Sequence, residues 1–572
     1  MFIQQHQRRI VILHLVLIAS VMVLTVMVVN PFRSVLLGDD AIYVKAVQRL
    51  VTEGKFKLPP GATASLVFQI LWAGLFTAPF RFSISAVVLS VLPLAVLGLS
   101  AYYGTILEFG HSKTVALMGT LTIVTSPLFI RLLPTFMTDV PFVSLMLIAI
   151  YCYVRGIKRN HCKFLIIGSV ATTFSLLTRQ TGLAIMIGIS VALIHDQIRE
   201  HKISWKKFAA ALTLPTFVLI AYSWWLYGMN GLTWAQKYVI IVPTRQNIES
   251  ASFPLHFIRN FTNSIAFTSL LVAPFLLMRR DKIVRALVDS FTKWRRVTVI
   301  FFSVTLILGL NLALGWGQLS YVPGVLYWMG LRLLQNVWPA IAILSLVFTL
   351  TLLLSQFERF RWVANPGNSS SATFFVLLLL CVCVVLISIL PDAQQTDRYL
   401  LPLLPLVGLV ILGETRFRPK KGIAITVMAF SLVWSAWTTR FWYDVAQVQW
   451  NEAERLVASG VAREDIRGNW AWEGWHFWDR CLDAAAMSGA VDASYNDCWH
   501  SKAETQYKVK LYSILDKSIT SSTEGYEIER LIPIRTFGIP ARVGVFYNAK
   551  AQNPKSISNG RAVVSSRDFE NQ

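Results

Sequence analysis

The chain has 572 residues, of which 55% are hydrophobic and only 15% are charged. Soluble domains carry roughly a quarter charged residues, so this composition excludes a soluble globular protein and indicates a polytopic membrane protein. The formal net charge is +22, but the basic residues lie in short clusters between apolar runs. This pattern favours membrane topology over nucleic-acid binding as the cause of the charge.

The first apolar run, Ile10 to Asn30, is long enough to cross a bilayer. Arg8 and Arg9 precede it, and it ends without a small-residue cleavage site. We therefore predict a retained signal anchor with the N-terminus in the cytoplasm.

Hydropathy predicts about thirteen transmembrane helices in total, of which the anchor is the first. The other predicted spans are Ile84–Leu107, Thr114–Leu133, Val140–Val154, Phe164–Leu177, Gly182–Ile194, Phe208–Tyr227, Phe261–Met278, Val297–Leu314, Val337–Leu354, Thr373–Leu390, Leu400–Leu412 and Ile423–Phe441. A further apolar stretch, Ala64–Phe80, is assigned to amphipathic or re-entrant helices in the first outer loop. Counting it as a span would reverse the side of every later loop.

The distribution of basic residues supports this topology. The loops assigned to the cytoplasm contain Arg155, Lys158, Arg159, Lys163, Arg199, Lys202, Lys206, Lys207, Arg279, Arg280, Lys282, Arg285, Lys293, Arg295, Arg296, Arg416, Arg418, Lys420 and Lys421. The short outer loops mostly carry one to three basic residues each. This bias predicts an odd number of spans and a C-terminal tail outside the cytoplasm.

Hydropathy falls after the last span, which divides the chain into a transmembrane catalytic domain, residues 1–441, and an extracytoplasmic mixed α/β domain, residues 442–572. A helix is expected at Asn451–Ser459, and strands at Gln506–Tyr512 and Ala541–Tyr547.

Two features of this outer domain leave alternatives open. Cys481 and Cys498 either form a disulfide in an oxidising compartment or remain two buried thiols. The aromatic stretch Asn469–Trp478 could stack on a sugar or lie at the membrane interface. Aromatic clusters are more often core, and the core interpretation is favoured here.

Two adjacent carboxylates, Asp39 and Asp40, follow the anchor at the membrane boundary, where a charged pair predicts a functional site. Apolar residues recur at helical spacing from Ala41 to Leu50, so both acids fall in the first turn of a surface helix that Gly54 ends. The helix dipole would keep them ionised, as a base or as metal ligands. The alternative is a plain helix cap, which needs only one of the two.

Later outer loops supply further charged residues. They are Asp139 in Pro134–Pro141, Arg179 in Leu177–Gly182, and Arg398 with Tyr399 in Asp397–Pro405. Singly, each residue could cap or turn a helix. Together they place acids and arginines on the same side of the membrane, as expected where a base faces a leaving phosphate held by guanidinium groups.

The acid pair, Thr-Asp-x-Pro, Leu-Thr-Arg-x-x-Gly and Arg-Tyr-x-x-Pro occur in an order that resembles the GT-C glycosyltransferases of the protein O-mannosyltransferase type. This type of glycosyltransferase includes bacterial relatives that add aminoarabinose to lipid A. The resemblance is best over Gly38–Ile194 and returns weakly near Arg398. It implies transfer of a sugar from a polyprenyl-phosphate carrier to an acceptor, with inversion, at the outer face.

The resemblance also implies residue roles. The Asp-Glu pair in the first loop of the relatives corresponds to Asp39 and Asp40. Asp39 would be the general base, and Asp40 replaces the Glu of the relatives. Asp139 falls on a residue that orients the acceptor or helps to bind a cation, so a divalent cation with Asp40 and Asp139 as ligands stays open. Arg179 and Arg398, the latter with Tyr399, would hold the carrier phosphate as charge builds on the leaving group.

Two further cations are candidate phosphate ligands. Relatives place Lys or His directly before a Pro-Pro pair, and Lys57 is a stand-in for that residue although it lies one position too early. Arg245, in the long outer loop Met229–Asn260, is a candidate from its charge and its predicted side alone.

Two other function classes are alternatives to a glycosyltransferase. A transporter or flippase for lipid-linked sugars would carry ionisable residues near mid-span and repeated halves, and the sequence shows neither pattern. A ligase of whole glycan chains is closer to the first hypothesis. Zinc and serine-hydrolase motifs are absent from the sequence. The acceptor could be a glycan, lipid or protein, and the expected location is the bacterial inner membrane.

Overall fold

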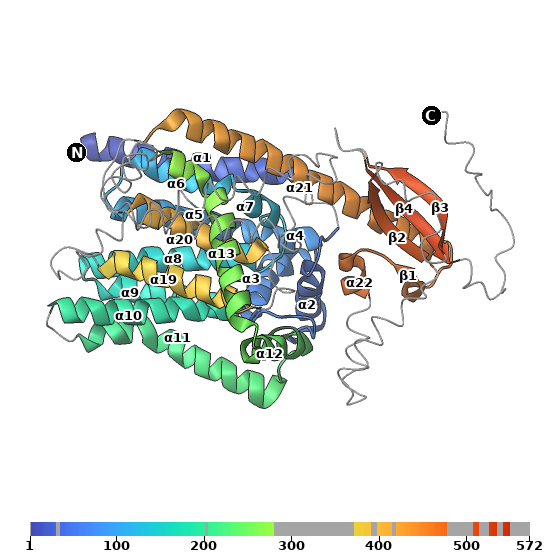
Figure 1. The fold of residues 1–572 in the computed structure, drawn as a ribbon, viewed down its shortest axis with the longest axis horizontal. Coiled ribbons are helices and arrows are strands. Elements are labelled where there is room, and N and C mark those ends of the chain that lie inside the picture. The colour runs from blue at the N-terminus through green and yellow to red at the C-terminus, as the bar shows by residue number, and fades with distance from the viewer. Residues whose placement is uncertain are drawn as a thin grey trace. The chain divides into compact units, whose positions relative to one another are not determined.

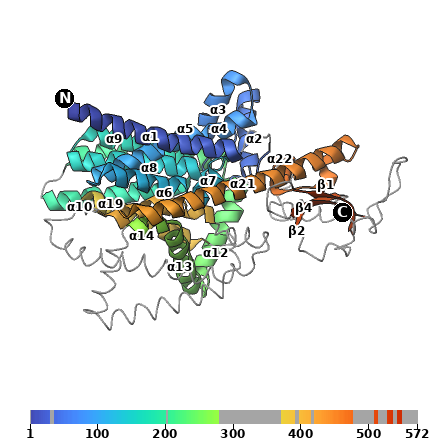
Figure 2. The same ribbon diagram turned by 90° about the horizontal axis from the view of Figure 1, so that it is seen from above.

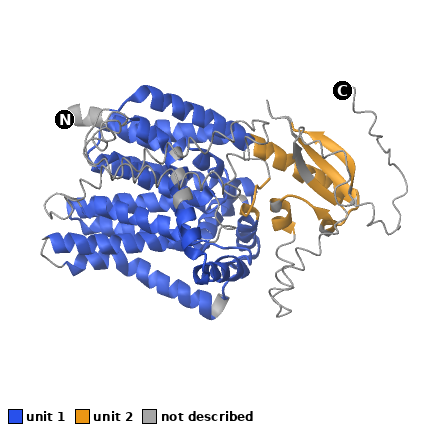
Figure 3. Cartoon of the chain, in the orientation of Figure 1, with its two compact units in different colours: residues 1–34, 42–327, 331–440 blue, residues 35–41, 328–330, 441–572 orange. Residues whose placement is uncertain are grey.

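The computed structural model describes residues 2–29, 35–200, 204–278, 371–390, 397–413, 419–476, 507–513, 526–534 and 541–548. The described residues fall into two compact units, the first bounded by 1–34, 42–327 and 331–440 and the second by 35–41, 328–330 and 441–572 (Figure 3). The predicted spans Val297–Leu314 and Val337–Leu354, and both Cys481 and Cys498, lie outside the described residues.

The first unit is helical (Figure 1). Its α-helices are α1 (Phe2–Val29), α2 (Asp40–Glu53), α3 (Val67–Thr77), α4 (Ile84–Leu89), α5 (Val91–Glu108), α6 (Lys113–Val124), α7 (Pro127–Leu132), α8 (Asp139–Arg159), α9 (Cys162–Thr178), α10 (Leu183–Glu200), α11 (Trp205–Trp225), α12 (Val242–Glu249), α13 (Phe253–Leu271), α14 (Ala273–Met278), α19 (Ser371–Ile389), α20 (Leu403–Leu412) and the start of α21 (Lys421–Ala458). Shorter 3-10 turns are η1 (Ala78–Phe80), η2 (Gln180–Gly182) and η6 (Asp397–Leu400), and π-helical turns are η3 (Leu226–Asn230) and η4 (Gln236–Ile241).

Seven helices among the described residues are long and apolar enough to cross a membrane, so the chain is a polytopic helical membrane protein. The stretch Ala64–Phe80 forms only α3 and η1, and the eleven residues of α3 rise about 16 Å, far short of the hydrocarbon thickness.

Two predicted spans are each divided into two helices at a proline. Thr114–Leu133 is not one helix but α6 and α7, because Ser126 precedes Pro127 and adopts an extended conformation. Phe261–Met278 is likewise divided into α13, which begins earlier at Phe253, and α14, whose second residue is Pro274.

Helix α8 is the centre of the first unit. It packs against α5 on one side and α9 on the other, and α9 in turn contacts α11 (Figures 1 and 2). Gly98 permits the α5 contact, because a Cβ there would lie 2.5 Å from the Ser144 Cα. Fifteen of the 21 residues of α8 are buried, so its first residue, Asp139, is held in a fixed framework.

The second unit contains a four-stranded sheet with the order β1-β2-β4-β3. Its elements are η7 (Arg463–Asp465), β1 (Ile466–Arg467), α22 (Trp470–His476), β2 (Tyr507–Ser513), β3 (Tyr526–Pro533) and β4 (Ala541–Asn548). β1 is parallel to β2, and the other pairs are antiparallel, with a bulge in β3 between Ile528 and Arg530. The expected strands correspond to β2 and β4.

Two predictions for this unit have clear outcomes. The helix expected at Asn451–Ser459 is confirmed up to Ala458, but it is the end of α21, which begins at Lys421 and runs unbroken for 38 residues, about 57 Å. In the aromatic stretch, the core interpretation is confirmed for Trp472, which is 1% exposed and meets Trp450 edge to face at 5.2 Å.

Candidate active site

A buried ion pair joins the start of α8 to the end of α9. The Asp139 carboxylate accepts from the Arg179 guanidinium, and their side chains are 1% and 12% exposed. Thr138, the residue before α8, makes no side-chain cap hydrogen bond. Arg179 reaches Asp139 because the chain becomes extended directly after α9, where φ is −146° and ψ is 140°.

Tyr399 is in contact with two guanidinium groups. Its ring centroid is 4.9 Å from the Arg179 Cζ and 5.4 Å from the Arg398 Cζ, within the range of cation–π attraction. Arg131 holds the same turn by pairing with Asp397 at 3.2 Å. This part of the site therefore brings guanidinium groups together around an aromatic ring, an arrangement that suits an anionic ligand.

Sequence reasoning missed two glutamines that frame this cluster. Gln69 Nε2 of α3 donates to the Phe136 carbonyl at 2.8 Å, and Gln180 Nε2 donates to the Thr63 carbonyl at 3.0 Å. The Leu66 N–H adds a bond to the Thr178 carbonyl at 3.2 Å. Gln69 is a buried polar residue in an apolar stretch, which is the signal that could have identified it.

The two other predicted phosphate ligands lie on different elements from Asp139 and Arg179. Arg245 lies on α12 with its side chain 77% exposed, and its Nε is 2.7 Å from Glu249 Oε1. Lys57 is an exposed residue between α2 and α3.

Asp39 and Asp40 differ in their surroundings. Asp40 is 1% exposed, and its Oδ1 accepts from the Gly38 N–H at 2.8 Å and the Leu37 N–H at 3.2 Å. Asp40 therefore fixes the turn before α2, whereas Asp39 is only half-buried. Both belong to the second compact unit, so their convergence with Asp139 and Arg179 stays a prediction.

Burial raises the pKa of Asp40 from 3.8 to about 6, although the bond from Gly38 opposes the rise. Between pH 3.8 and about 6, the native state therefore binds more protons than the unfolded state. The free energy of unfolding falls by about 3 kcal/mol as the pH rises through this range. Asp40→Asn keeps an acceptor oxygen and removes the charge. We expect the variant to match the wild type near pH 4 and to unfold at a higher temperature than the wild type at pH 7.5. Equal pH dependence of the two unfolding temperatures would contradict this assignment.

Within the described residues, no group of three or more His, Cys, Asp or Glu side chains is placed to hold a metal ion. Asp139 is engaged by Arg179, and Asp40 by backbone N–H groups. Both carboxylates therefore have protein partners of their own.

Residues 66–227 match the family model described as dolichyl-phosphate-mannose-protein mannosyltransferase. The predicted resemblance to the protein O-mannosyltransferase type is confirmed. This mannosyltransferase-like region, residues 66–227, contains Gln69, Asp139 and Arg179. Asp39, Arg398 and Tyr399 lie outside it. No curated protein sequence matches the chain.

Several solved structures are similar to this chain. Against the Saccharomyces cerevisiae O-mannosyltransferase Pmt1-Pmt2 complex bound to the sugar donor, the identity is 15% and the TM-score 0.31, over 40% of this chain and 36% of that one. For ArnT of Cupriavidus metallidurans bound to undecaprenyl phosphate, the identity is 13% and the TM-score 0.40, over 94% of this chain and 99% of that one. For the Archaeoglobus fulgidus oligosaccharyltransferase AglB, in complex with an inhibitory peptide and a dolichol-phosphate, the identity is 10% and the TM-score 0.45, over 87% of this chain and 69% of that one.

Proposed function

We propose that this chain is a membrane glycosyltransferase that moves a sugar from a polyprenyl-phosphate carrier to an acceptor at the outer face of the membrane. The observation that carries the proposal is the group of guanidiniums around Tyr399, two of which, Arg179 and Arg398, lie against its ring. Arg179 falls within the mannosyltransferase-like region. Such a group suits a phosphate that gains charge as it leaves.

The reaction is a single displacement. Asp39 accepts the proton of an acceptor hydroxyl, whose oxygen forms a bond to the anomeric carbon as the bond from that carbon to the phosphate oxygen breaks. The electron pair leaves with the polyprenyl phosphate, and attack from the opposite side inverts the anomeric centre.

The residues around the phosphate have separate roles. Arg179 and Arg398 stabilise the charge on the departing phosphate, and Asp139 holds the Arg179 guanidinium in place through their buried ion pair. Tyr399 supports both guanidiniums with its ring face. Lys57 and Arg245 remain candidates for contacts that form only when the carrier is bound.

A transfer assay tests this function. Membranes that contain the protein would receive a panel of radiolabelled polyprenyl-phosphate sugars, and the label would be followed into glycan, lipid and protein fractions. We expect one sugar to pass from the carrier to a single acceptor class. Movement of the intact labelled carrier across the membrane, without any product, would instead identify a flippase.

A further inference from the structure

A side chain of helix α3 is bonded to the turn that leads into Asp139. Gln69 Nε2 donates to the Phe136 carbonyl at 2.8 Å and to the Met137 carbonyl at 3.4 Å, so each amide hydrogen has its own acceptor. Among the described residues, no backbone N–H donates to either carbonyl. Gln69 therefore supplies the donors that these two carbonyls need.

The same turn contacts both arginines of the candidate site. Met137 Sδ lies 3.5 Å from Arg398 Nη1. Two residues later, Asp139 pairs with Arg179 in the buried ion pair. Tyr399 is in contact with both guanidiniums. The position of this turn therefore affects how far apart the two guanidiniums lie.

Helix α3 is itself fixed on α9. The Phe68 ring stacks on the Phe174 ring, with their centroids 4.5 Å apart. The Leu66 N–H donates to the Thr178 carbonyl at 3.2 Å. Leu66 is fully buried and has a φ of 60°, in the left-handed region that leucine rarely adopts. Such a conformation persists only where the surrounding contacts hold it, so α3 is a firm support for Gln69.

Packing alone does not explain the amide of Gln69. The side chain is 1% exposed, and the next buried positions of the same helix are Ile70, Ala73 and Gly74. Its Oε1 is buried and accepts no hydrogen bond within the part of the chain that the structure describes. A leucine would fill a similar space without the cost of that unpaired oxygen. The Nε2 bonds to the two carbonyls are therefore the reason for an amide at this position.

We propose that Gln69 is a positioning residue for the carrier phosphate, because it holds the turn before α8 so that Arg179 and Arg398 face one anion together. The inference rests on the proposed function and adds a residue that acts through that turn rather than by touching substrate. A displacement of about 1 Å in a catalytic site can cost about 100-fold in rate. The bonds of one amide are therefore enough to affect transfer.

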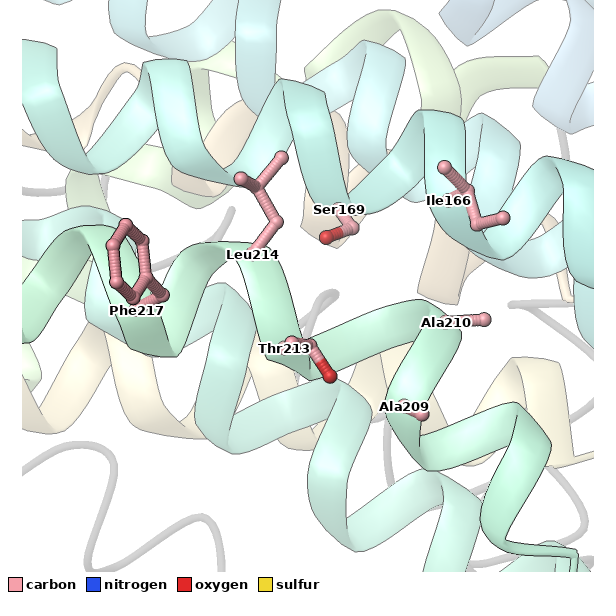
Figure 4. A pocket seen from close by; sticks show the side chains of 7 residues that line it. All are labelled: Ile166, Ser169, Ala209, Ala210, Thr213, Leu214 and Phe217. Carbon is pink, nitrogen blue, oxygen red and sulfur yellow. The ribbon is translucent and has the colours of Figure 1, made fainter.

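The test measures binding of radiolabelled polyprenyl phosphate without a sugar to the full-length protein in detergent, together with single-turnover transfer. Gln69→Leu removes both bonds and keeps the approximate volume of the side chain. We expect it to weaken binding by about tenfold and to lower kcat/KM by about 10- to 100-fold. Gln69 is not among the seven residues that line the apolar hollow between α9 and α11 (Figure 4), so a loss would not come from filling this hollow.

Gln197→Leu is the matched control for this substitution. Gln197 Nε2 also donates to a backbone carbonyl, that of Ser204, at 3.3 Å. Helix α10 begins at Leu183, close in sequence to Arg179, and Gln197 lies about 21 Å further along the helix. The variant should change binding and transfer by less than about twofold.

A second measurement separates positioning from a general loss of structure. Arg398→Gln removes one of the guanidiniums that Gln69 is proposed to hold in place. In that background Gln69→Leu should weaken binding less than it does in the wild type, because the spacing of two guanidiniums no longer matters. Independent effects multiply, so a double variant whose loss equals the product of the two single losses would overturn the proposal. So would wild-type binding by Gln69→Leu.

Gln69→Glu serves if Gln69→Leu does not fold. It keeps the length of the side chain, but only its protonated carboxyl can donate to a carbonyl. Its binding relative to the wild type should therefore improve as the pH falls from about 8 to about 5, and an unchanged ratio would contradict the proposal. Binding of the carrier without sugar transfer would remove the proposed function alone. Transfer by Gln69→Leu at the wild-type rate would remove only this inference.

Discussion

Asp39→Asn is expected to lower the rate of sugar transfer by about 10²- to 10⁴-fold, the usual contribution of a positioned general base. The amide cannot accept the acceptor proton, but it keeps the size of the side chain. Because Asp39 is half-buried and Asp40 already fixes the turn before α2, the loss should appear in kcat with little change in folding. The measurement is single-turnover transfer from a radiolabelled polyprenyl-phosphate sugar.

Glu53→Gln is the matched control, since it makes the same change at the exposed last residue of α2. It should leave the rate within about twofold, as expected for a charge that stabilises no part of the reaction. Transfer by Asp39→Asn at the wild-type rate would remove Asp39 as the base.

Arg179→Gln is expected to reduce transfer by about 10²- to 10³-fold, because it removes a charge aimed at the departing phosphate. It should also destabilise the protein by about 3–5 kcal/mol, since Asp139 would be left buried without its partner. Adding Asp139→Asn removes that unpaired charge. The double variant should therefore regain most of the unfolding temperature without regaining activity.

Arg159→Gln is the control for this series, because Arg159 ends the same helix that Asp139 begins and pairs with Glu108 at a half-exposed position. Exposed pairs contribute about 1 kcal/mol or less, so both transfer and unfolding temperature should stay near the wild-type values. Recovery of transfer in the double variant would show that Arg179 acts only through folding.

Hydropathy predicted the helices that are continuous and failed where backbone chemistry intervenes. Pro127 and Pro274 interrupt apolar runs that look unbroken on a hydropathy scale, because apolarity carries no information about a missing N–H. A fall in hydropathy near residue 441 predicted the division of the chain but not the secondary structure there, which is α21. The 38-residue helix continues through it, since helical hydrogen bonds do not depend on the polarity of the surroundings.

The candidate site was predictable where charge and order along the chain were informative. The sequence placed Asp139, Arg179 and Arg398 on one side of the membrane, and the structure joins the first two in an ion pair and places both arginines against Tyr399. Gln180 could not be predicted, because an amide that binds a distant carbonyl leaves no periodic pattern, and Gln69 was missed although it is a polar residue in an apolar stretch. Arg245 was inferred from its charge and its predicted side of the membrane alone, and neither distinguishes a phosphate ligand from a member of an exposed i,i+4 pair.

The buried carboxylate beside Arg179 has a consequence for the catalytic cycle. A guanidinium that is already half neutralised binds a phosphomonoester less tightly than a bare cation would. In the proposed reaction, the spent carrier competes with Asp139 for the same donor after transfer, and the internal partner is always present at high effective concentration. This competition would limit product inhibition and free the lipid for recycling.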